Sequence, residues 1–576
     1  MNQTDEQDDL NEESNTTPEP KRGTSMNGTT MFKYAIVLIA FAALFACGGG
    51  GSGNGASPFV AGLVFKADKD TDGTEELYAA SADGTQAIKL SGSLAADFVI
   101  DSYQVSEDRQ YVAYVVTDNS QLYQISKLYV VNVNGGTPIR VSGIPTVTGS
   151  LLITNFVWSP DGMWLAYRGI QDTQGKFELY TVRSDGSENV KISMDAQNNI
   201  KTDFKWAPDS SRIAYRTSLS SILHTVQPDG LNNIEISGSL VLNGAVYENF
   251  RWSPDSLRVA YRADQDIDGV VELYISLANG GSNIQVSSVI SDASSTAELV
   301  EFKWSPDGTR IAYIANHDIW YRHELYVALS DGSNSNKVSG VVVNTTDVNV
   351  ASNFKWSPDS SSLAYQADLQ IDRVHDLYTV NANGSNNIKV STTLKPPVGN
   401  IFAGGRVRQF MWAPDNSRIA YVAVTNLEII NVFRLYTVKP DGTENTEVSG
   451  AMPLNGGVGF AKWSPDSTWL AYDAQQEAYD INGYILPREL YSVRFNGTGN
   501  SKVSGTMPTN PNVFTLTGNV IGYAWRADSQ QLLYRADQSI DEQFELYTGQ
   551  ADGSGDIKIS GPLVDEGDVL GYVLIE

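Results

Sequence analysis

Short apolar runs separated by turn signals dominate the chain, and residues 250–288 show the pattern most clearly. Four runs rich in β-branched and aromatic residues alternate there with polar segments: Phe250–Trp252, Leu257–Arg262, Glu272–Ser276 and Asn283–Ser287. Runs of this length and composition predict β-strands. Ser253-Pro254-Asp255 predicts a tight turn, because proline presets φ and aspartate can bond its own backbone. Asn279-Gly280 predicts a type I′ hairpin.

This four-strand unit recurs with a period of about fifty residues, which is typical of the blades of a β-propeller. The first strands are marked by a recurring tryptophan, or by valine in one degenerate copy: Val105, Trp158, Trp206, Trp252, Trp304, Trp356, Trp412, Trp463 and Trp525. The third strands are marked by Leu-Tyr, or Leu-His in one copy, beginning at Leu77, Leu128, Leu179, Leu223, Leu273, Leu325, Leu377, Leu435, Leu490 and Leu546. The pattern therefore predicts an all-β protein of stacked four-stranded antiparallel blades.

The two sets of markers differ in number, and the difference predicts how the ring closes. Ten third strands face only nine first strands, because the repeat that begins at Gly62 has no first strand of its own. The C-terminal residues 571–576 resemble the first strand at 522–525. We therefore expect the C-terminus to supply the missing inner strand of the N-terminal blade, closing one ring of ten blades and leaving no exposed sheet edge. Two smaller propellers are the alternative.

Composition and charge narrow the functional classes. The chain has 19% charged and 10% aromatic residues, as expected of a globular protein, and its net charge is −27. Such an acidic balance argues against nucleic acid as a partner, because phosphates would be repelled. It is compatible with carboxylates that hold cations. The single cysteine, Cys47, excludes an intrachain disulfide.

The N-terminal region divides into segments of different composition. Residues 1–30 are polar and acidic, and we interpret them as a disordered leader or a misassigned start. Residues 31–46 contain an apolar stretch, Tyr34–Ala46, that is short for a membrane span and fits a secretory signal. An uncleaved signal-anchor is the alternative. Residues 47–58 are a glycine- and serine-rich tether, and residues 59–576 form the propeller.

Two resemblances add to this organisation. The ending Leu44-Phe45-Ala46-Cys47 resembles the lipobox of bacterial lipoproteins, which implies that Cys47 becomes the lipidated first residue of the mature protein. By the sorting rules of that family, the absence of aspartate after Cys47 implies the outer membrane, on its periplasmic or surface side. The units at 156–167, 178–193 and 302–313 resemble the TolB-like, or PD40 (WD40-like), propeller repeats across residues 59–576. This resemblance implies the fold and does not specify an activity.

Acidic hairpins between the second and third strands are the candidate metal sites. Two copies read D-x-D-x-D-G-x-x-E, a spacing of oxygen ligands around a turn glycine that suits calcium and resembles the calcium hairpins of integrin-type propellers. Their ligands, with a backbone carbonyl at the seventh position, are Asp68, Asp70, Asp72, Thr74 and Glu76, and Asp264, Asp266, Asp268, Val270 and Glu272. A solvated acidic hairpin is the alternative. Two degenerate copies have Arg373 and Glu542 in place of the glycine and keep Asp368, Gln370, Asp372 and Asp376, and Asp537, Ser539, Asp541 and Glu545.

The loops suggest where function resides. In a propeller, the hairpins between second and third strands share one face with the blade-to-blade connections, and these connections are long and dissimilar here. We therefore hypothesise a non-enzymatic binding scaffold, anchored in the cell envelope by its lipid, whose calcium-stabilised face binds an envelope protein or a polysaccharide. A polysaccharide-active lyase or hydrolase with a site in the central funnel is the alternative, although the four histidines are scattered and no G-x-S-x-G motif occurs. The recurring Arg168, Arg216 and Arg262 are expected to contact neighbouring blades or to extend along the surface. The oligomeric state is not predicted.

Overall fold

The computed structural model describes most of the chain after residue 58. Its described residues are 59–71, 73–120, 122–194, 199–218, 221–287, 299–316, 322–341, 350–371, 373–395, 405–424, 432–453, 456–476, 487–508, 518–540, 542–564 and 567–575, with only the backbone at 350–352. The chain divides into Met1–Ser57 and Pro58–Glu576. The predicted leader, signal, Cys47 and tether therefore lie outside the described residues. Within the described ranges, no helix has the length and apolar character needed to cross a membrane.

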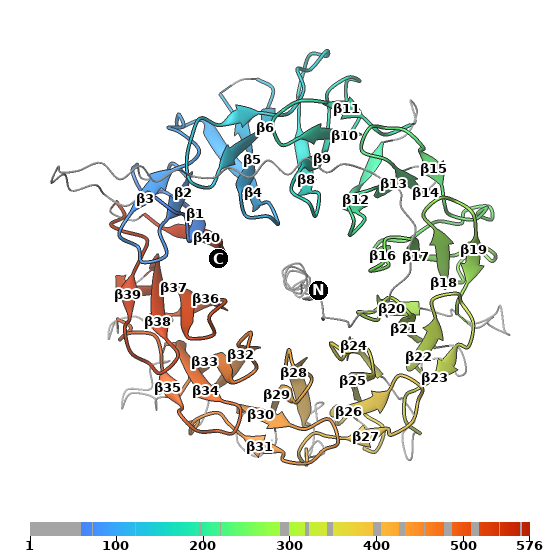
Figure 1. Ribbon diagram of the computed structural model, residues 1–576, viewed down its shortest axis with the longest axis vertical. Helices are drawn as coiled ribbons and strands as arrows, with labels where there is room; N and C mark the ends of the chain where they lie inside the picture. The colour runs from blue at the N-terminus through green and yellow to red at the C-terminus, as the bar shows by residue number, and fades with distance from the viewer. Residues whose placement is uncertain are drawn as a thin grey trace, which may run out of the picture. The chain divides into compact units, whose positions relative to one another are not determined.

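The second unit is a ring of ten four-stranded antiparallel sheets, as predicted (Figure 1). We number the blades in chain order: blade 1 is β40 with β1–β3, blade 2 is β4–β7, and each later blade takes the next four strands up to β36–β39 in blade 10. The inner strands, in blade order, are β40 (Val569–Leu574), β4 (Phe98–Val105), β8 (Ile153–Trp158), β12 (Ile200–Trp206), β16 (Arg251–Trp252), β20 (Leu299–Trp304), β24 (Val350–Trp356), β28 (Arg406–Trp412), β32 (Gly457–Trp463) and β36 (Val520–Trp525).

The other strands follow outward in each blade. The second strands are β1 (Leu63–Ala67), β5 (Tyr111–Asp118), β9 (Trp164–Gly169), β13 (Ile213–Thr217), β17 (Arg258–Ala263), β21 (Arg310–Ala315), β25 (Ser362–Ala367), β29 (Ile419–Val424), β33 (Trp469–Gln475) and β37 (Gln531–Ile540). The third strands are β2 (Glu76–Ala80), β6 (Ile125–Asn132), β10 (Glu178–Arg183), β14 (Leu223–Val226), β18 (Glu272–Leu277), β22 (Glu324–Leu329), β26 (Asp376–Asn381), β30 (Phe433–Val438), β34 (Glu489–Arg494) and β38 (Gln543–Gln550). The outer strands are β3 (Ala87–Lys89), β7 (Ile139–Arg140), β11 (Val190–Lys191), β15 (Ile234–Glu235), β19 (Asn283–Gln285), β23 (Asn336–Lys337), β27 (Ile388–Lys389), β31 (Thr446–Glu447), β35 (Ser501–Lys502) and β39 (Ile557–Lys558).

The C-terminal strand closes the ring, as predicted from the unequal numbers of strand markers. Strand β40 pairs antiparallel with β1, and the register places Leu574 opposite Leu63 and Tyr572 opposite Phe65. The first and last strands of this unit, β1 and β40, thus belong to the same blade, blade 1. The pairing supplies the inner strand that the N-terminal repeat lacks. The ten blades form one ring, so the alternative of two smaller rings is wrong (Figure 1).

The hydrophobic core lies between blades. One buried cluster, for example, joins Ile314 and Leu325 of blade 6 to Phe354 and Trp356 of blade 7. Another joins blade 10 to blade 1 across the closure. Because each blade buries its faces only against its neighbours, the closed ring is the unit that removes apolar surface from water.

The tryptophans that mark the first strands also link consecutive blades. Each of the eight donates its indole Nε1–H to a backbone carbonyl on the inner strand of the preceding blade, at 3.0–3.3 Å. Trp252, for example, bonds the carbonyl of Lys205. Blade 2 has Val105 at this position, and β40 contains no tryptophan. Blade 1 is therefore joined to both neighbours without such a bond.

The turns between strands confirm one prediction and correct another. Asp255 Oδ1 accepts the backbone N–H of Leu257 at 3.0 Å, as expected for the Ser-Pro-Asp turn. The turn at Asn279-Gly280 is not type I′, because only Gly280 has a positive φ, of 76°. The N–H of Gly280 bonds the carbonyl of Leu277, which gives a type I turn followed by a left-handed glycine. Asn279 instead accepts the N–H of Gly281 with its side chain, at 3.0 Å.

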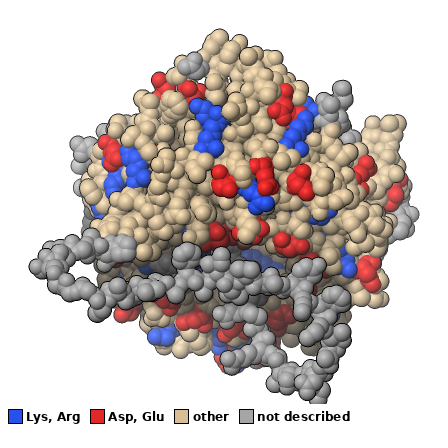
Figure 2. All heavy atoms as spheres, turned by 45° about the horizontal axis from the view of Figure 1, so that its top comes forward, with Lys and Arg blue, Asp and Glu red and all other residues tan. Residues whose placement is uncertain are grey.

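The recurring arginines of the second strands reach the next blade, as expected. Arg168 Nε donates to the carbonyl of Ile200 at 2.7 Å, and Arg262 Nη1 donates to that of Leu299 at 2.9 Å. Elsewhere the charged side chains are mixed: on the face shown in Figure 2, basic and acidic groups lie close together between larger uncharged areas.

Candidate functional site

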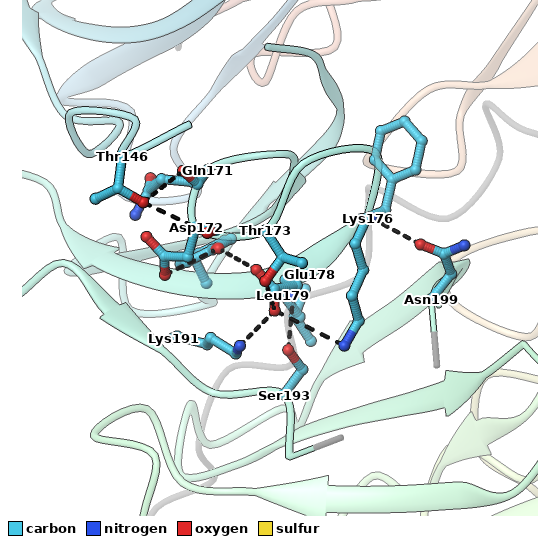
Figure 3. Close-up of polar contacts among 12 residues, drawn as sticks. Thr146, Gln171, Asp172, Thr173, Lys176, Glu178, Leu179, Lys191, Ser193 and Asn199 are labelled. Carbon is cyan, nitrogen blue, oxygen red and sulfur yellow. Dashed lines mark hydrogen bonds and ion pairs between the residues drawn. The ribbon is translucent and has the colours of Figure 1, made fainter. Parts of the chain in front are cut away.

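The hairpins between second and third strands lie at the same end of the propeller as the blade-to-blade connections. In blade 5, Asp264 Oδ1 accepts the N–H of Ala245, in the connection that enters this blade, at 2.6 Å. In blade 3, Thr146 of the entering connection bonds the carbonyl of Gln171 (Figure 3). We call this end the loop face and the opposite end, with the Ser-Pro-Asp turns, the turn face.

The first aspartate of each acidic hairpin accepts hydrogen bonds from backbone N–H groups, which the sequence did not predict. Asp68 and Asp537, like Asp264, accept a backbone N–H from the connection that leads into the first strand of their own blade. The second carboxylate oxygen of Asp264 accepts the N–H of Gly269 at 3.2 Å. In the degenerate copy of blade 7, Asp368 accepts the N–H of Arg373 at 3.4 Å. This aspartate therefore fixes the hairpin to the backbone.

The sixth residue of the hairpin has the left-handed conformation for which glycine was expected. Gly73 and Gly269 have φ values of 70° and 81°. Arg373 and Glu542 adopt the same conformation, with φ values of 61° and 64°. Because a side chain at positive φ costs about 1–2 kcal/mol, the degenerate copies keep the turn at the expense of stability. Loss of the glycine therefore does not change the path of the loop.

An acidic residue at the start of the third strand is buried in every predicted hairpin. Glu76, Glu272, Asp376 and Glu545 are all at most 5% exposed. A hydroxyl from the tyrosine two residues later reaches three of them: the Tyr78, Tyr274 and Tyr547 oxygens lie 3.0, 3.1 and 2.7 Å from a carboxylate oxygen of Glu76, Glu272 and Glu545. A buried carboxylate needs hydrogen bonds and a counter-charge, because the cost of removing it from water is several kcal/mol.

In blade 3 the counter-charge is visible (Figure 3). Glu178 is fully buried, and Lys191 of the outer strand bonds its carboxylate. A second ammonium, that of Lys176, lies 3.9 Å from the same oxygen, and Thr173 donates to it at 3.3 Å. The outer-strand lysine thus occupies the place where a bound cation would neutralise the acid.

This lysine recurs thirteen residues after the acid. Six blades contain the ion pair: Glu76–Lys89, Glu178–Lys191, Glu324–Lys337, Asp376–Lys389, Glu489–Lys502 and Glu545–Lys558. Blade 8 reverses it, with Arg434 Nη1 2.7 Å from Glu447 Oε1. Blade 5 has the acid, Glu272, but Gln285 stands where the lysine would be. The recurring lysine is visible in the sequence, but its meaning depends on the pairing of the third and outer strands.

The two complete hairpins therefore differ in their surroundings. In blade 1, Lys89 Nζ lies 2.8 Å from Asp70 Oδ2 and also bonds Glu76. The hydrogen bond from Lys89 lowers the pKa of Asp70 below its ordinary value. In blade 5, the hydroxyl of Tyr274 lies between two carboxylates, 2.9 Å from Asp266 Oδ2 and 3.1 Å from Glu272 Oε2. Burial and these carboxylates raise the pKa of Tyr274 well above its ordinary value, so the hydroxyl stays protonated as a donor.

The remaining predicted ligands lie as follows. Asp268 Oδ2 accepts Asn243 Nδ2–H at 3.4 Å, Ser539 Oγ lies 2.7 Å from the Tyr547 hydroxyl, and Gln370 is exposed. The N–H groups of Thr74 and Val270 bond the carbonyls of Thr71 and Ile267. Asp72, Asp372 and Asp541 lie outside the described residues. Among the residues with described positions, no three His, Cys, Asp or Glu side chains are grouped to hold a metal ion. Calcium binding stays a prediction.

Comparisons with known proteins relate the chain to other propeller proteins only at a distance. The family model for the dipeptidyl peptidase IV (DPP IV) N-terminal region matches residues 281–375. No curated protein matches the chain. The matched segment comprises the outer strand of blade 5, all of blade 6 and the first two strands of blade 7.

Three solved structures are similar over larger parts of the chain. A eukaryotic initiation factor is 13% identical, with 76% of this chain and 94% of that chain covered and a TM-score of 0.44. The putative TolB from Agrobacterium tumefaciens is 13% identical, with 45% and 83% covered and a TM-score of 0.26. An oligogalacturonate lyase in complex with manganese is 15% identical, with 68% and 87% covered and a TM-score of 0.31. Similarity at this level carries no argument about activity.

Proposed function

We propose that the protein is a non-enzymatic binding scaffold of the bacterial cell envelope, anchored in the outer membrane by a lipid on Cys47. Its loop face would bind an envelope protein or a polysaccharide. The observation that supports this proposal is the position of the most exposed large apolar side chains among the described residues: Leu122, Ile144, Leu242 and Val341, which are 82–90% exposed. All four lie on the loop face, three of them in blade-to-blade connections.

The concentration of the most exposed apolar side chains at the loop face favours an interaction surface there, because contact of apolar groups with water is unfavourable. The turn face differs in character. Its turns repeat the same Ser-Pro-Asp geometry from blade to blade, with Ser253 and Ser305, for example, each donating to the aspartate two residues on. Variable loops on a rigid, repeated frame are a common arrangement for binding.

Replacing the four loop-face residues by serine should abolish partner recovery. The tagged, lipidated protein would be cross-linked in its own envelope, and recovered partners would be compared between the native chain and the variant carrying L122S, I144S, L242S and V341S. The matched control is a variant with M163S, L231S and L257S, whose residues are 57–62% exposed on the turn face. Equal recovery by both variants, or no partner with the native chain, would contradict the proposal.

We further propose that calcium binds the hairpin of blade 5. The carboxylates of Asp266, Asp268 and Glu272 and the carbonyl of Val270 would hold it, and Asp264 would orient the loop through its backbone bonds. Oxygen ligands of this kind suit calcium, which would supply the positive charge that lysine supplies in six other blades. Blade 1 has the same motif but also Lys89 between Asp70 and Glu76. Calcium and lysine are thus alternative counter-ions in this proposal.

Calcium should stabilise the native chain but not a Gln285→Lys variant. At a calcium concentration of about 100 times Kd, the native state gains about 2.7 kcal/mol. The introduced ammonium should neutralise Glu272 and remove this gain. Unfolding would be followed by guanidinium titration in calcium and in chelator. The reciprocal variant Lys89→Gln should add a second calcium-dependent increment, from blade 1. Equal stabilisation of the native chain and Gln285→Lys would contradict the assignment to blade 5.

A further inference from the structure

A cluster of arginine and phenylalanine side chains lies on the inner strands of blades 8 and 9 and at the start of the third strand of blade 8. The guanidinium carbon of Arg408 lies 5.4 Å from the ring centre of Phe433 and 5.2 Å from that of Phe460. Arg406 lies 6.0 Å from the ring of Phe433. Both arginines are exposed, and Phe460 is 48% exposed. We call these four residues the arginine–phenylalanine cluster.

The cluster lies toward the loop face, beside the centre of the ring. Strands β28 and β32, which carry Arg406, Arg408 and Phe460, are the innermost strands of their blades (Figure 1). Arg406 is the first residue of β28, and Phe433 is the first residue of β30. The first and third strands of a blade both begin at the loop face. The cluster is therefore accessible from the face that we propose binds a partner.

Hydrogen bonds between the two blades fix the strands that carry the cluster. The side-chain amide of Gln409, next to Arg408, bonds Ala461 twice: Nε2 donates to its carbonyl at 3.2 Å, and Oε1 accepts its N–H at 3.0 Å. Ala461 directly follows Phe460. This paired bond locks β28 and β32 in register at the point where Arg408 meets the ring.

Phe460 is held from both sides of its backbone. Its N–H donates to Asp473 Oδ1, and its carbonyl accepts the hydroxyl of Tyr523, both at 2.8 Å. Asp473 in turn pairs with Arg488 at 2.6 Å. A side chain at Gly459 would overlap this pair, since a Cβ there would lie 2.0 Å from Asp473 Oδ2. The backbone that carries this half-exposed aromatic ring is thus fixed by hydrogen bonds. Because little freedom remains to be lost, the entropy cost of binding a ligand is lower.

The charge of the cluster contrasts with the acidic chain. Strands β28, β32, β36 and β40 contain no aspartate or glutamate, whereas the inner strands β4, β12 and β20 contain Asp101, Asp203 and Glu301. The neighbouring Arg434 and Arg488 are paired with Glu447 and Asp473. Within the described ranges, no ion pair is found for Arg406 or Arg408. Two exposed guanidinium groups on an innermost strand therefore lie beside the rings of Phe433 and Phe460.

We propose that the arginine–phenylalanine cluster binds the carboxylated sugars of an acidic polysaccharide. A planar guanidinium matches a carboxylate, with two parallel hydrogen bonds. The exposed face of Phe460 can stack on the apolar face of a sugar ring, and one uronic acid residue presents both groups. A protein partner would instead place its anchor in a buried pocket, which a half-exposed ring on a strand does not form. This inference rests on the proposed binding function and selects its ligand class.

Uronate binding by the full chain tests the inference. The probe is a hexasaccharide of alginate, measured by calorimetry at low salt. We expect Arg408→Gln to weaken binding about tenfold or more, because a hydrogen bond to a charged group is lost. Phe460→Leu, which keeps an apolar side chain without the ring, should weaken it several-fold. The control is Lys201→Gln, a basic residue near the start of inner strand β12 with no place in the cluster. Matching circular dichroism and unfolding curves would show that the variants fold.

Each other outcome decides against the inference. A neutral maltohexaose that binds as tightly as the uronate would exclude carboxylate recognition. Poly-glutamate that binds more tightly than the uronate would favour an acidic polypeptide instead. Absence of uronate binding, with partners still recovered in the cross-linking experiment, would overturn this inference alone and leave the binding scaffold in place. Unchanged affinity in Arg408→Gln would place any uronate site elsewhere.

Discussion

Deleting residues 569–576 is expected to unfold the ring, or to lower its stability by on the order of 5 kcal/mol or more. The deletion removes β40, whose partner residues Leu63, Val64 and Phe65 are fully buried in the intact protein. The deletion also removes Val569 and so exposes the side chains that Val569 covers in the cluster between blade 10 and blade 1. Blade 1 would keep three strands and present an unpaired apolar edge, which favours aggregation.

Guanidinium unfolding and limited proteolysis would measure the effect of the deletion. A synthetic peptide of residues 567–576, added in excess, should restore part of the stability if strand pairing is the cause. Val573→Thr serves as the control, because this β40 side chain is 37% exposed and its change should cost little. A truncated chain that unfolds at the same denaturant concentration as the full chain would contradict the role of β40 in closing the ring.

Replacing Lys389 by methionine is expected to destabilise the protein by about 2–4 kcal/mol near pH 7. The ammonium lies 2.7 Å from Asp376 Oδ2, and Asp376 is 1% exposed. Methionine keeps most of the apolar stem of lysine. The loss of stability in this variant therefore measures the contribution of the positive charge. The carboxylate would keep the hydroxyl of Ser391, at 2.8 Å, but lose its counter-ion.

The effect of Lys389→Met should shrink as the pH falls. Burial raises the pKa of Asp376 above its ordinary 3.8, and Lys389 opposes this rise. An acid with a raised folded-state pKa binds more protons when folded, so it favours folding most below its unfolded-state pKa and less as the pH rises through its folded-state pKa. Without the lysine the pKa rises further. The variant should therefore lose most stability near pH 7 and least near about pH 4, where Asp376 is neutral.

Denaturant titrations at both pH values, on the native and variant chains, would measure this difference. The double variant Asp376→Asn/Lys389→Met should recover much of the loss, because no buried charge remains. Arg258→Met, which breaks the more exposed pair with Asp255, should cost less than about 1 kcal/mol. An equal loss at pH 7 and at low pH would mean that the Lys389 stem, rather than its charge, stabilises the blade.

The repeat pattern predicted the blades, their number and the closure, because the strand markers are local to each repeat and can be counted along the chain. The tryptophan at the end of each first strand and the Leu-Tyr pair in each third strand are local markers. The missing first strand before Gly62 was enough to assign the C-terminal strand. The type I′ prediction at Asn279-Gly280 failed for a local reason as well, since the side chain of Asn279 bonds the backbone of Gly281 and the glycine alone takes positive φ.

The candidate sites were predicted less completely, because they depend on contacts between strands and between blades. The acidic hairpins could be found by spacing, but their counter-ions could not. Tyr78 pairs with Lys89, so the lysine reaches the acid diagonally across the third and outer strands. The arginine–phenylalanine cluster joins residues from two blades, and nothing in either repeat alone places Arg408 beside Phe460. Both features follow from register and ring geometry.

The tryptophan bonds give the propeller a direction of assembly. Each indole reaches back to the blade that precedes it in the chain, so a blade emerging during synthesis can attach to one that is already made. Blade 1 is the exception: it is begun first, has no such bond on either side, and receives its inner strand from the last residues of the chain. The ring therefore cannot close until β40 has been made and pairs with β1.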